Sequence, residues 1–224
     1  YINYWTLENG KRPDYREVDR LFFLFKEYCY FHPSIVGVVR LKGRRQGATS
    51  IGSYWQWWIC GRNEWKNGGI VSFNDDAAAA VFQKMFMLGF KALLPCFQEE
   101  FDSSDDSKSY IRFVKPVERK KKGVLALKRE GLNSYIDYKA LTINSYDSGR
   151  LSYGLFDESG KFHRVNVNLF WSVVSKTLRE GRKKVGFAYL PTTVNPKNQG
   201  GENFREFYED SNQHKSGINT HPKV

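Results

Sequence analysis

The segment that most constrains the fold is residues 34–60, where a short apolar run leads through a glycine-containing loop into a helical pattern. The run SIVGVVRL, residues 34–41, is apolar and β-branched, as expected for a strand buried on both faces of a parallel sheet. The stretch TSIGSYWQWWIC, residues 49–60, predicts a helix whose aromatic side chains pack inward and which ends at Gly61. A strand that leads into a helix in this way begins a βαβ unit, so the segment predicts an α/β fold.

Strand and helix patterns continue to alternate along the rest of the chain. A helix is predicted over residues 15–31, where apolar residues recur at helical spacing: Val18, Leu21, Phe22, Phe25, Tyr28 and Cys29. Further strands are predicted over residues 69–74, 110–116, 123–131, 133–144, 150–160 and 184–193, with residues 117–122 as a basic connection. Further helices are predicted over 75–94, 168–181 and 202–211, the second of them ended by Gly181. This order predicts three layers, with a largely parallel central sheet flanked by helices.

Composition sets broad limits on the function. The 224 residues, 41% of them hydrophobic, suffice for one core, so we expect one domain over residues 1–211 and a polar tail over 212–224. A formal charge of +11 favours a polyanionic partner such as DNA. Three widely spaced cysteines indicate neither a disulfide framework nor a zinc site. No apolar run reaches the roughly 20 residues of a membrane helix, so we expect a soluble protein.

The loop after the first strand, KGRRQGATS, departs from the standard phosphate-binding pattern G-x-x-x-x-G-K-[ST]. That pattern needs glycines so that backbone N–H groups can surround phosphates, a lysine for the β- and γ-phosphates, and a hydroxyl for magnesium. Gly47 and Thr49 occupy the second glycine and the hydroxyl positions. Gly43 lies only four residues before Gly47, and Ala48 stands where the lysine is expected. The strict pattern is therefore not met.

The missing charge is available at the front of the same loop. Lys42, Arg44 and Arg45 lie there, and a long cationic side chain from that side can reach the same phosphate oxygens. For this loop taken alone, a basic turn that binds no ligand is the other interpretation.

A pair of carboxylates follows a later predicted strand. The stretch SYGLFDES places Asp157 and Glu158 at the carboxyl end of an apolar run, where ligands of open α/β sheets bind. In nucleoside triphosphatases an aspartate there holds magnesium, and an adjacent glutamate polarises the attacking water. Taken alone, the pair can also be a strand stop or a helix cap. Both motifs, in this order and each after an apolar strand, favour triphosphate hydrolysis.

With both motifs placed, the chain resembles the ATPase domain of tailed-phage large terminase subunits, the motors that pump DNA into a procapsid. KGRRQGATS resembles the deviant phosphate loop (Walker A) of that family, with Lys42 as the displaced cation and Arg45 as the internal arginine. LFDES resembles its second motif (Walker B), which implies Asp157 as the metal ligand and Glu158 as the catalytic base. The similarity spans roughly residues 36–211.

The resemblance also implies a coupling motif, a fold and cofactors. YLPTTVNP resembles the third motif of the family, which places Thr192 and Thr193 near the γ-phosphate. The implied fold is the P-loop NTPase fold of the additional-strand, catalytic-glutamate type, and the implied cofactors are ATP and Mg²⁺, the latter held by Thr49 and Asp157. Lys42, Glu158 and Arg45 are the implied catalytic residues. The implied nucleotide-binding residues are Gly43, Arg44, Gln46, Gly47, Ala48, Thr49 and Ser50.

The partners implied by the resemblance are double-stranded DNA, a portal and a small terminase subunit. Family motors act as homo-oligomeric rings, pentamers in the family, so we expect a ring when active and a monomer as an isolated domain. The expected location is the cytoplasm of an infected bacterial host. The family's nuclease domain has no counterpart after Ser211, so no nuclease activity is expected from this segment. Residues 212–224 suit the start of a linker to such a domain.

Three further sets of residues have both a functional and a structural interpretation. Residues 1–35 form the expected adenine side of the site, where Tyr4 and Trp5 either stack on the base or, as we favour, pack as ordinary core residues. Within the basic stretch 115–129, four residues either contact the DNA backbone or form a solvated turn: Arg119, Lys120, Lys121 and Lys122. The same ambiguity holds for a second basic cluster, which can also act across a subunit interface: Arg179, Arg182, Lys183 and Lys184.

Two functions from other classes stay open. A helicase-like nucleic-acid-dependent ATPase is expected to carry a second, related lobe, and the sequence contains none. A non-enzymatic basic DNA-binding module predicts no magnesium-dependent nucleotide binding.

Overall fold

A six-stranded sheet forms the centre of the computed structural model, which describes residues 1–102, 109–121, 124–199 and 201–211. The strands lie in the order β1 (Gly37–Leu41), β8 (Phe187–Thr192), β5 (Tyr153–Phe156), β2 (Asn67–Val71), β4 (Val124–Tyr138) and β3 (Tyr110–Lys121). Neighbouring strands are parallel except for the β3–β4 pair. Strand β8 follows β5 in the chain but lies between β1 and β5, which confirms the predicted additional-strand arrangement and the largely parallel sheet.

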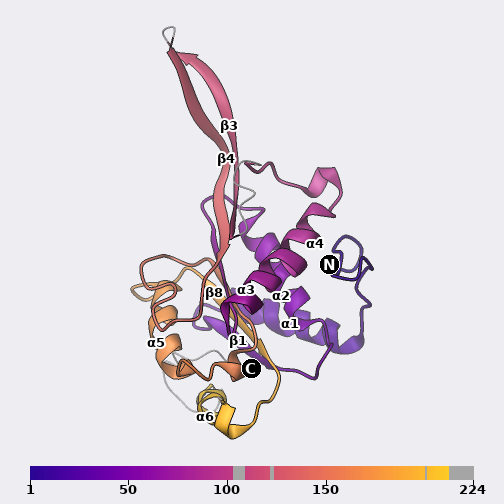
Figure 1. Ribbon diagram of the computed structural model, residues 1–224, viewed down its shortest axis with the longest axis vertical. Coiled ribbons are helices and arrows are strands. Elements are labelled where there is room, and N and C mark those ends of the chain that lie inside the picture. The colour runs from indigo at the N-terminus through magenta and orange to yellow at the C-terminus, as the bar shows by residue number, and fades with distance from the viewer. Residues whose placement is uncertain (103–108, 122–123, 200, 212–224) are drawn as a thin grey trace.

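Helices cover both faces of the sheet (Figure 1). One face packs against α1 (Glu17–Phe31), α2 (Ala48–Cys60), α3 (Asp75–Ala80) and α4 (Leu88–Lys91), and the other against α5 (Val167–Thr177) and α6 (Gly201–Asp210). The alternation of side chains along a strand builds both cores, since Phe187 and Tyr189 of β8 join the first and Ala188 and Leu190 the second. Among the described residues, no helix has the length and apolar character needed to cross a membrane.

The β3–β4 hairpin extends well beyond the rest of the sheet (Figure 1). Residues 117–121, predicted as part of a connection, continue β3, and the two separate strands predicted over 123–131 and 133–144 form one strand that ends at Tyr138. The register shifts between Phe113 and Val114, opposite Gly131. Gly131 has a φ of +129°, and a Cβ there would lie 2.9 Å from the carbonyl oxygen of Phe113, so this bulge requires glycine. Gly131, which the sequence pattern places at the end of a strand, therefore forms a bulge within one long strand.

Two helices differ from their predicted bounds. The helix predicted over residues 75–94 begins at α3, where the side chain of Asn74 accepts a hydrogen bond from Ala77 N at 2.7 Å, and continues through the π-helical segment η1 (Val81–Met87) into α4. Helix α5 ends at Thr177, before the predicted Gly181. Gly181 instead has a φ of +58° in the turn of a small hairpin, β6 (Arg179–Glu180) and β7 (Lys183–Lys184). The remaining short helices are η2 (Pro95–Phe97), η4 (Ser159–Lys161) and η5 (Lys197–Gln199).

Helix α1 buries residues that its apolar pattern did not predict. Of the apolar residues in that pattern, Cys29 is buried and Phe22 and Phe25 are half-buried, but the other three are exposed: Val18, Leu21 and Tyr28. The innermost positions are taken by Asp19 and Lys26, which the helical period places on the same side. The prediction of the helix was right, and the prediction of its buried face was partly wrong.

Lys26 is fully buried, and its Nζ donates a hydrogen bond of 2.8 Å to Tyr153 Oη. Its Nζ also faces the rings of Trp55 and Tyr189, at 4.3 and 4.4 Å from the ring centroids. Burial lowers the pKa of Lys26 strongly, and the nearby Arg40 lowers it further. The unfolded chain therefore binds a proton that the native protein releases, so the Lys26 contribution to stability increases as pH rises toward the ordinary lysine pKa.

We predict that Lys26→Met increases the free energy of unfolding at pH 7 by about 1–3 kcal/mol, because a similar volume is kept and the cost of burying a basic group disappears. The gain should shrink as pH rises toward 10. Denaturant unfolding of both proteins from pH 6 to 10 measures this. A variant that is less stable than the parent at every pH would show that the Tyr153 and aromatic contacts outweigh the cost of burial.

Candidate nucleotide-binding site

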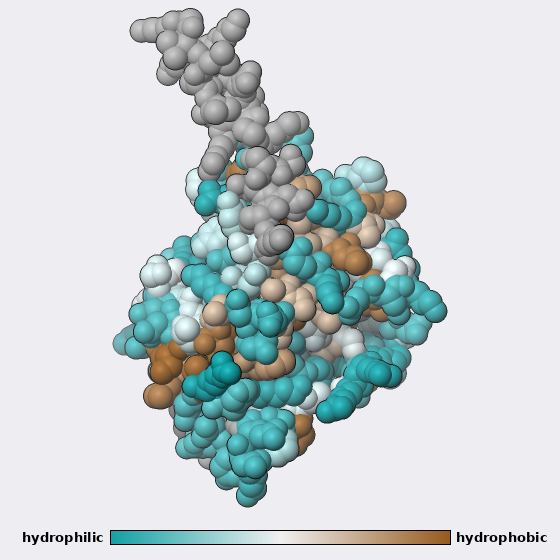
Figure 2. Space-filling view, in the orientation of Figure 1, coloured by the Kyte–Doolittle hydropathy of each residue, from teal (hydrophilic) through white to brown (hydrophobic). Residues whose placement is uncertain are grey.

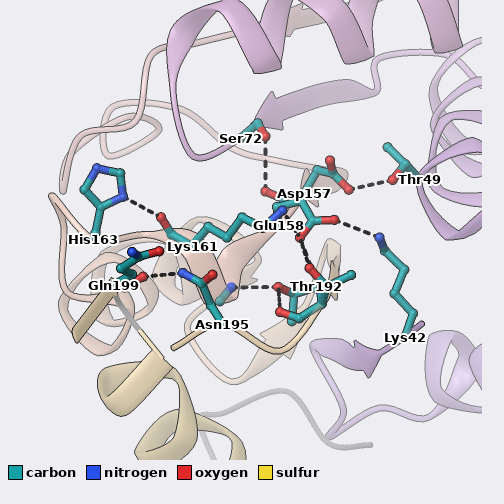
Figure 3. A network of polar contacts seen from close by, with 12 residues as sticks. Lys42, Thr49, Ser72, Asp157, Glu158, Lys161, His163, Thr192, Asn195 and Gln199 are labelled. Atoms are coloured by element: carbon teal, nitrogen blue, oxygen red, sulfur yellow. Dashed lines mark hydrogen bonds and ion pairs between the residues drawn. The ribbon is translucent and has the colours of Figure 1, made fainter. Parts of the chain in front are cut away.

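The three predicted motifs meet at the carboxyl edge of the sheet (Figure 3). Strand β1 leads into the loop that starts at Lys42, β5 leads into Asp157 and Glu158, and β8 ends between them at Thr192. Backbone hydrogen bonds extend this pairing, since Lys42 N donates to Thr192 O at 2.9 Å and Glu158 N donates to Pro191 O at 2.8 Å. The parallel order β1-β8-β5 thus brings together residues that are more than 100 positions apart in the chain.

No side chain caps the N-terminus of α2. Gly47, its N-cap residue, has a φ of 70° and contributes no side-chain cap, and the first turn contains no acidic residue. Arg45 also has a positive φ, 61°, so the backbone of the loop turns sharply before the helix. The first N–H groups of a helix lack partners within the helix and carry the positive end of its dipole, which favours a phosphate there.

A cavity of about 560 Å³ opens beside this helix end. It is lined by residues of the loop together with residues of the N-terminal segment and η1: Leu7, Glu8, Asn9, Lys42, Arg45, Gln46, Gly47, Ala48, Thr49, Ser50 and Met85. Seven of the nine predicted catalytic and nucleotide-binding residues of the loop therefore line one cavity, whereas Gly43 and Arg44 lie in the exposed front of the loop.

Glu158 is held from several sides. Its Oε1 lies 2.8 Å from Lys42 Nζ, and its Oε2 accepts hydrogen bonds from the hydroxyl of Thr193 at 2.8 Å and from Thr193 N at 3.2 Å. Lys161 Nζ lies 3.1 Å from the same Oε2. Burial alone raises the pKa of Glu158, but the hydrogen bonds from Lys42 and Thr193 outweigh it and bring the pKa to about 2. Glu158 is therefore ionised and oriented at neutral pH.

Asp157 is in a different environment from its neighbour. Its Oδ1 accepts a hydrogen bond of 2.7 Å from Thr49 Oγ1, and the residue is only 6% exposed. Burial raises its pKa to about 6, although the Thr49 hydrogen bond acts in the opposite direction. A buried carboxylate beside a hydroxyl offers two oxygen donors of the kind that Mg²⁺ prefers, the remaining positions being normally filled by water and substrate phosphates. The residues present therefore fit the metal that the motif implies.

Thr192 and Thr193 connect this site to the next segment of the chain. Thr192 Oγ1 accepts a hydrogen bond from Gly160 N at 2.9 Å and donates one to Thr193 O at 3.1 Å. A Cβ on Gly160 would lie 2.8 Å from Thr192 Oγ1, so position 160 needs glycine for this close approach. Thr193 thus contacts Glu158, while Thr192 connects the same end of β8 to η4. Helix α6 packs against η4.

Sequence reasoning missed three residues at this site. The only sequence signal for Lys161 is its position four residues after Asp157, and the only signal for Gly160 is that it is a glycine directly before Lys161. Arg16 had no signal in the sequence, because it reaches the loop from 30 residues away and donates a hydrogen bond of 2.8 Å to Gln46 O. Its guanidinium is held by Asp19 at 2.9 Å. The start of α1 thus supports the loop.

The remaining predicted residues lie apart from this site. Trp5 is fully buried, which confirms its packing role, and Tyr4 packs on Phe97 with ring centroids 4.8 Å apart. Lys184 donates hydrogen bonds to three backbone carbonyl groups at the end of α1, so its role is structural. Arg119, Lys120 and Lys121 belong to β3, but their side chains, and all of Lys122, lie outside the described residues.

Comparison of this geometry with known proteins identifies the fold. No family model matches the chain, and no curated protein matches it by sequence. Among solved structures, the HK97 bacteriophage large terminase superposes with a TM-score of 0.62 at 12% identity, over 94% of this chain and 39% of that one. The Thermus phage P74-26 large terminase ATPase domain gives a TM-score of 0.52 at 14% identity, over 97% of this chain and 79% of that one. The chain thus has the fold found in phage large terminases, and it spans about two fifths of the HK97 protein.

The raised pKa of Asp157 predicts an unusual pH dependence of stability without divalent ions. The native state keeps the proton up to about pH 6, whereas the unfolded chain releases it near 3.8, so stability falls as pH rises through this window. Asp157→Asn should therefore be more stable than the parent by about 1–3 kcal/mol at pH 7.5 and equally stable at pH 4. Chemical denaturation in EDTA at the two pH values tests this. A variant destabilised equally at both pH values would contradict the raised pKa of this buried carboxylate.

Proposed function

We propose that this chain is an ATP-hydrolysing motor domain of a viral genome-packaging terminase, which couples hydrolysis to the translocation of double-stranded DNA into a procapsid. The observation that carries the proposal is the Lys42–Glu158 ion pair at 2.8 Å, which joins the loop at the bare N-terminus of α2 to the carboxylates at the end of β5. The resemblance of the three motifs and the likeness of the fold to large terminases support it.

The loop supplies the phosphate contacts in this proposal. Backbone N–H groups from Gly43 to Thr49 bind the phosphate oxygens, and the displaced lysine, Lys42, moves its ammonium group from Glu158 onto them. Arg45, which lines the same cavity, adds a second cation. Thr49 and Asp157 are the residues that would hold Mg²⁺, which neutralises phosphate charge when bound. Residues Leu7–Asn9, on the expected adenine side, line the cavity with the loop.

Glu158 acts as the general base. Once Lys42 contacts phosphate, the freed Oε1 can accept a proton from water as the water oxygen attacks the γ-phosphorus and the bond to the β-phosphate oxygen breaks. Thr193 keeps Oε2 in place during this step. Thr192 accepts a hydrogen bond from Lys42 N through its carbonyl group and one from Gly160 N through its hydroxyl. A shift of the loop at Lys42 or of the end of β8 at Thr192 is therefore transmitted to η4 and α6. We propose this as the route from hydrolysis to movement.

The proposed polymer is duplex DNA, which fits the formal charge of +11. The β3–β4 hairpin, whose sequence contains Arg119, Lys120, Lys121 and Lys122, extends from the body of the domain and is the proposed DNA-contacting segment (Figure 1). The proposed assembly is a homo-oligomeric ring of the kind the family forms, pentameric there, with a portal and a small terminase subunit as partners. The proposed setting is the cytoplasm of an infected bacterial host.

Calorimetric titration with Mg²⁺ and ATP tests the proposal. We expect Lys42→Ala to weaken binding at least tenfold, because it removes the main phosphate cation, or about 1.4 kcal/mol. Glu158→Gln should leave binding intact and reduce hydrolysis at least about 100-fold, because it removes the base. Lys176→Ala, at an exposed lysine in the last turn of α5, is the matched control and should change neither quantity.

Addition of duplex DNA separates the remaining functions. Stimulation of the ATPase by duplex DNA supports the packaging motor, whereas stimulation by single strands alone supports a helicase-like ATPase. A parent protein that binds DNA but binds no nucleotide with Mg²⁺ would contradict the proposal and favour a non-enzymatic DNA-binding module.

A further inference from the structure

Helix α1 has a polar inner face and an apolar outer face. Its inward side chains include Asp19 and Lys26, which are 2% and 0% exposed. Its outward face carries an apolar stripe at intervals of three or four residues, with exposed fractions of 49, 54, 56, 62 and 72% for Val18, Leu21, Leu24, Tyr28 and Phe31 respectively. A surface helix of a monomer normally has the opposite arrangement. The inward polar residues fix α1 to the domain, so the apolar stripe is available to a partner.

The stripe is large enough for a stable interface. The five side chains expose about 600 Å², if a fully exposed aromatic side chain presents about 200 Å². Beside the stripe, between α1 and α2, lies a largely aromatic groove of about 610 Å³, whose lining includes Tyr15, Leu24 and Trp58. Tyr15 and Trp58 are 45% and 46% exposed and bring the total near 800 Å², which is what each partner contributes to a standard interface. Monomers seldom expose an apolar patch of this size.

The charges around the stripe indicate which partner fits. The exposed charged residues of α1 are Glu17, Arg20 and Glu27, which sum to −1 on a protein of formal charge +11. Along α1 itself two positively charged copies can therefore approach with little repulsion. The basic residues Arg182, Lys183 and Lys184 line a separate pocket at the Phe31 end of the stripe. Arg20 and Glu27 both line the groove, seven residues apart. A twofold axis between them places each beside its opposite charge on the other copy.

We propose that the apolar face of α1 binds a second copy of this chain, with the two α1 helices antiparallel across a twofold axis near Leu24. Phe31 lies seven residues, or about 10 Å, beyond Leu24 along the helix. In the antiparallel pair it reaches the opposite end of the partner helix, near Tyr15, which lines the groove. The pair does not depend on the proposed ATPase activity, and it differs from the monomer expected from the sequence.

Sedimentation velocity without nucleotide or DNA, from 1 to 200 µM chain, tests the pairing. We expect the mass to rise from 26.1 kDa toward twice that value, and Leu24→Glu to weaken association at least about tenfold. Leu169→Glu is the matched control, because Leu169 is 53% exposed on α5, where Figure 2 shows a hydrophobic group on an otherwise mostly hydrophilic face. It should leave association unchanged. Circular dichroism confirms that both variants are folded.

Charge exchange tests the twofold axis itself. Arg20→Glu and Glu27→Arg should each weaken the pair severalfold, and the double variant should restore it, because opposite charges again face each other. Three results would overturn the proposal: a parent that stays monomeric at 200 µM, a pair that Leu24→Glu and Leu169→Glu weaken equally, or an assembly of more than two chains that Leu24→Glu abolishes. None of these results bears on nucleotide binding, so the two proposals fail or survive separately.

Discussion

The ion pair between Lys42 and Glu158 is the interaction on which the candidate site depends. Both side chains are largely buried, 8% and 13% exposed, so separating them in the absence of a ligand leaves two poorly solvated charges. A phosphate group offers Lys42 another anion, while Lys161 and Thr193 continue to stabilise Glu158. The site therefore resists opening by itself, and the proposed mechanism exchanges one partner of Glu158 for a nucleotide. This exchange depends on β8, which sets the distance between β1 and β5.

Helix α1 contributes to the molecule through both of its faces. From its inner face, Asp19 holds Arg16, which bonds the loop at Gln46, and Asp19 also lies 3.5 Å from Arg40 on β1. The outer face carries the apolar stripe centred on Leu24. The same helix thus supports the loop from one face and forms the proposed contact with a second copy from the other.

The sequence predicted the fold class and the order of the three motifs because strand patterns and glycine loops are local signals. It could not predict which cation meets Glu158, since Lys42, Arg44 and Arg45 are alike in sequence and only strand geometry separates them. It divided β4 at Gly131, because a bulge and a strand end look the same without the partner strand. It misassigned the outer face of α1, because the buried contacts of Lys26 come from Tyr153, 127 residues away.

A crystal structure with Mg²⁺ and a non-hydrolysable ATP analogue would test the central claim most directly. The account predicts phosphates at the N-terminus of α2, Lys42 Nζ within hydrogen-bond distance of a phosphate oxygen, and Glu158 released from Lys42 but still bonded to Thr193. Nucleotide bound elsewhere, for example in the aromatic groove beside α1, with the 2.8 Å Lys42–Glu158 pair intact, would contradict it.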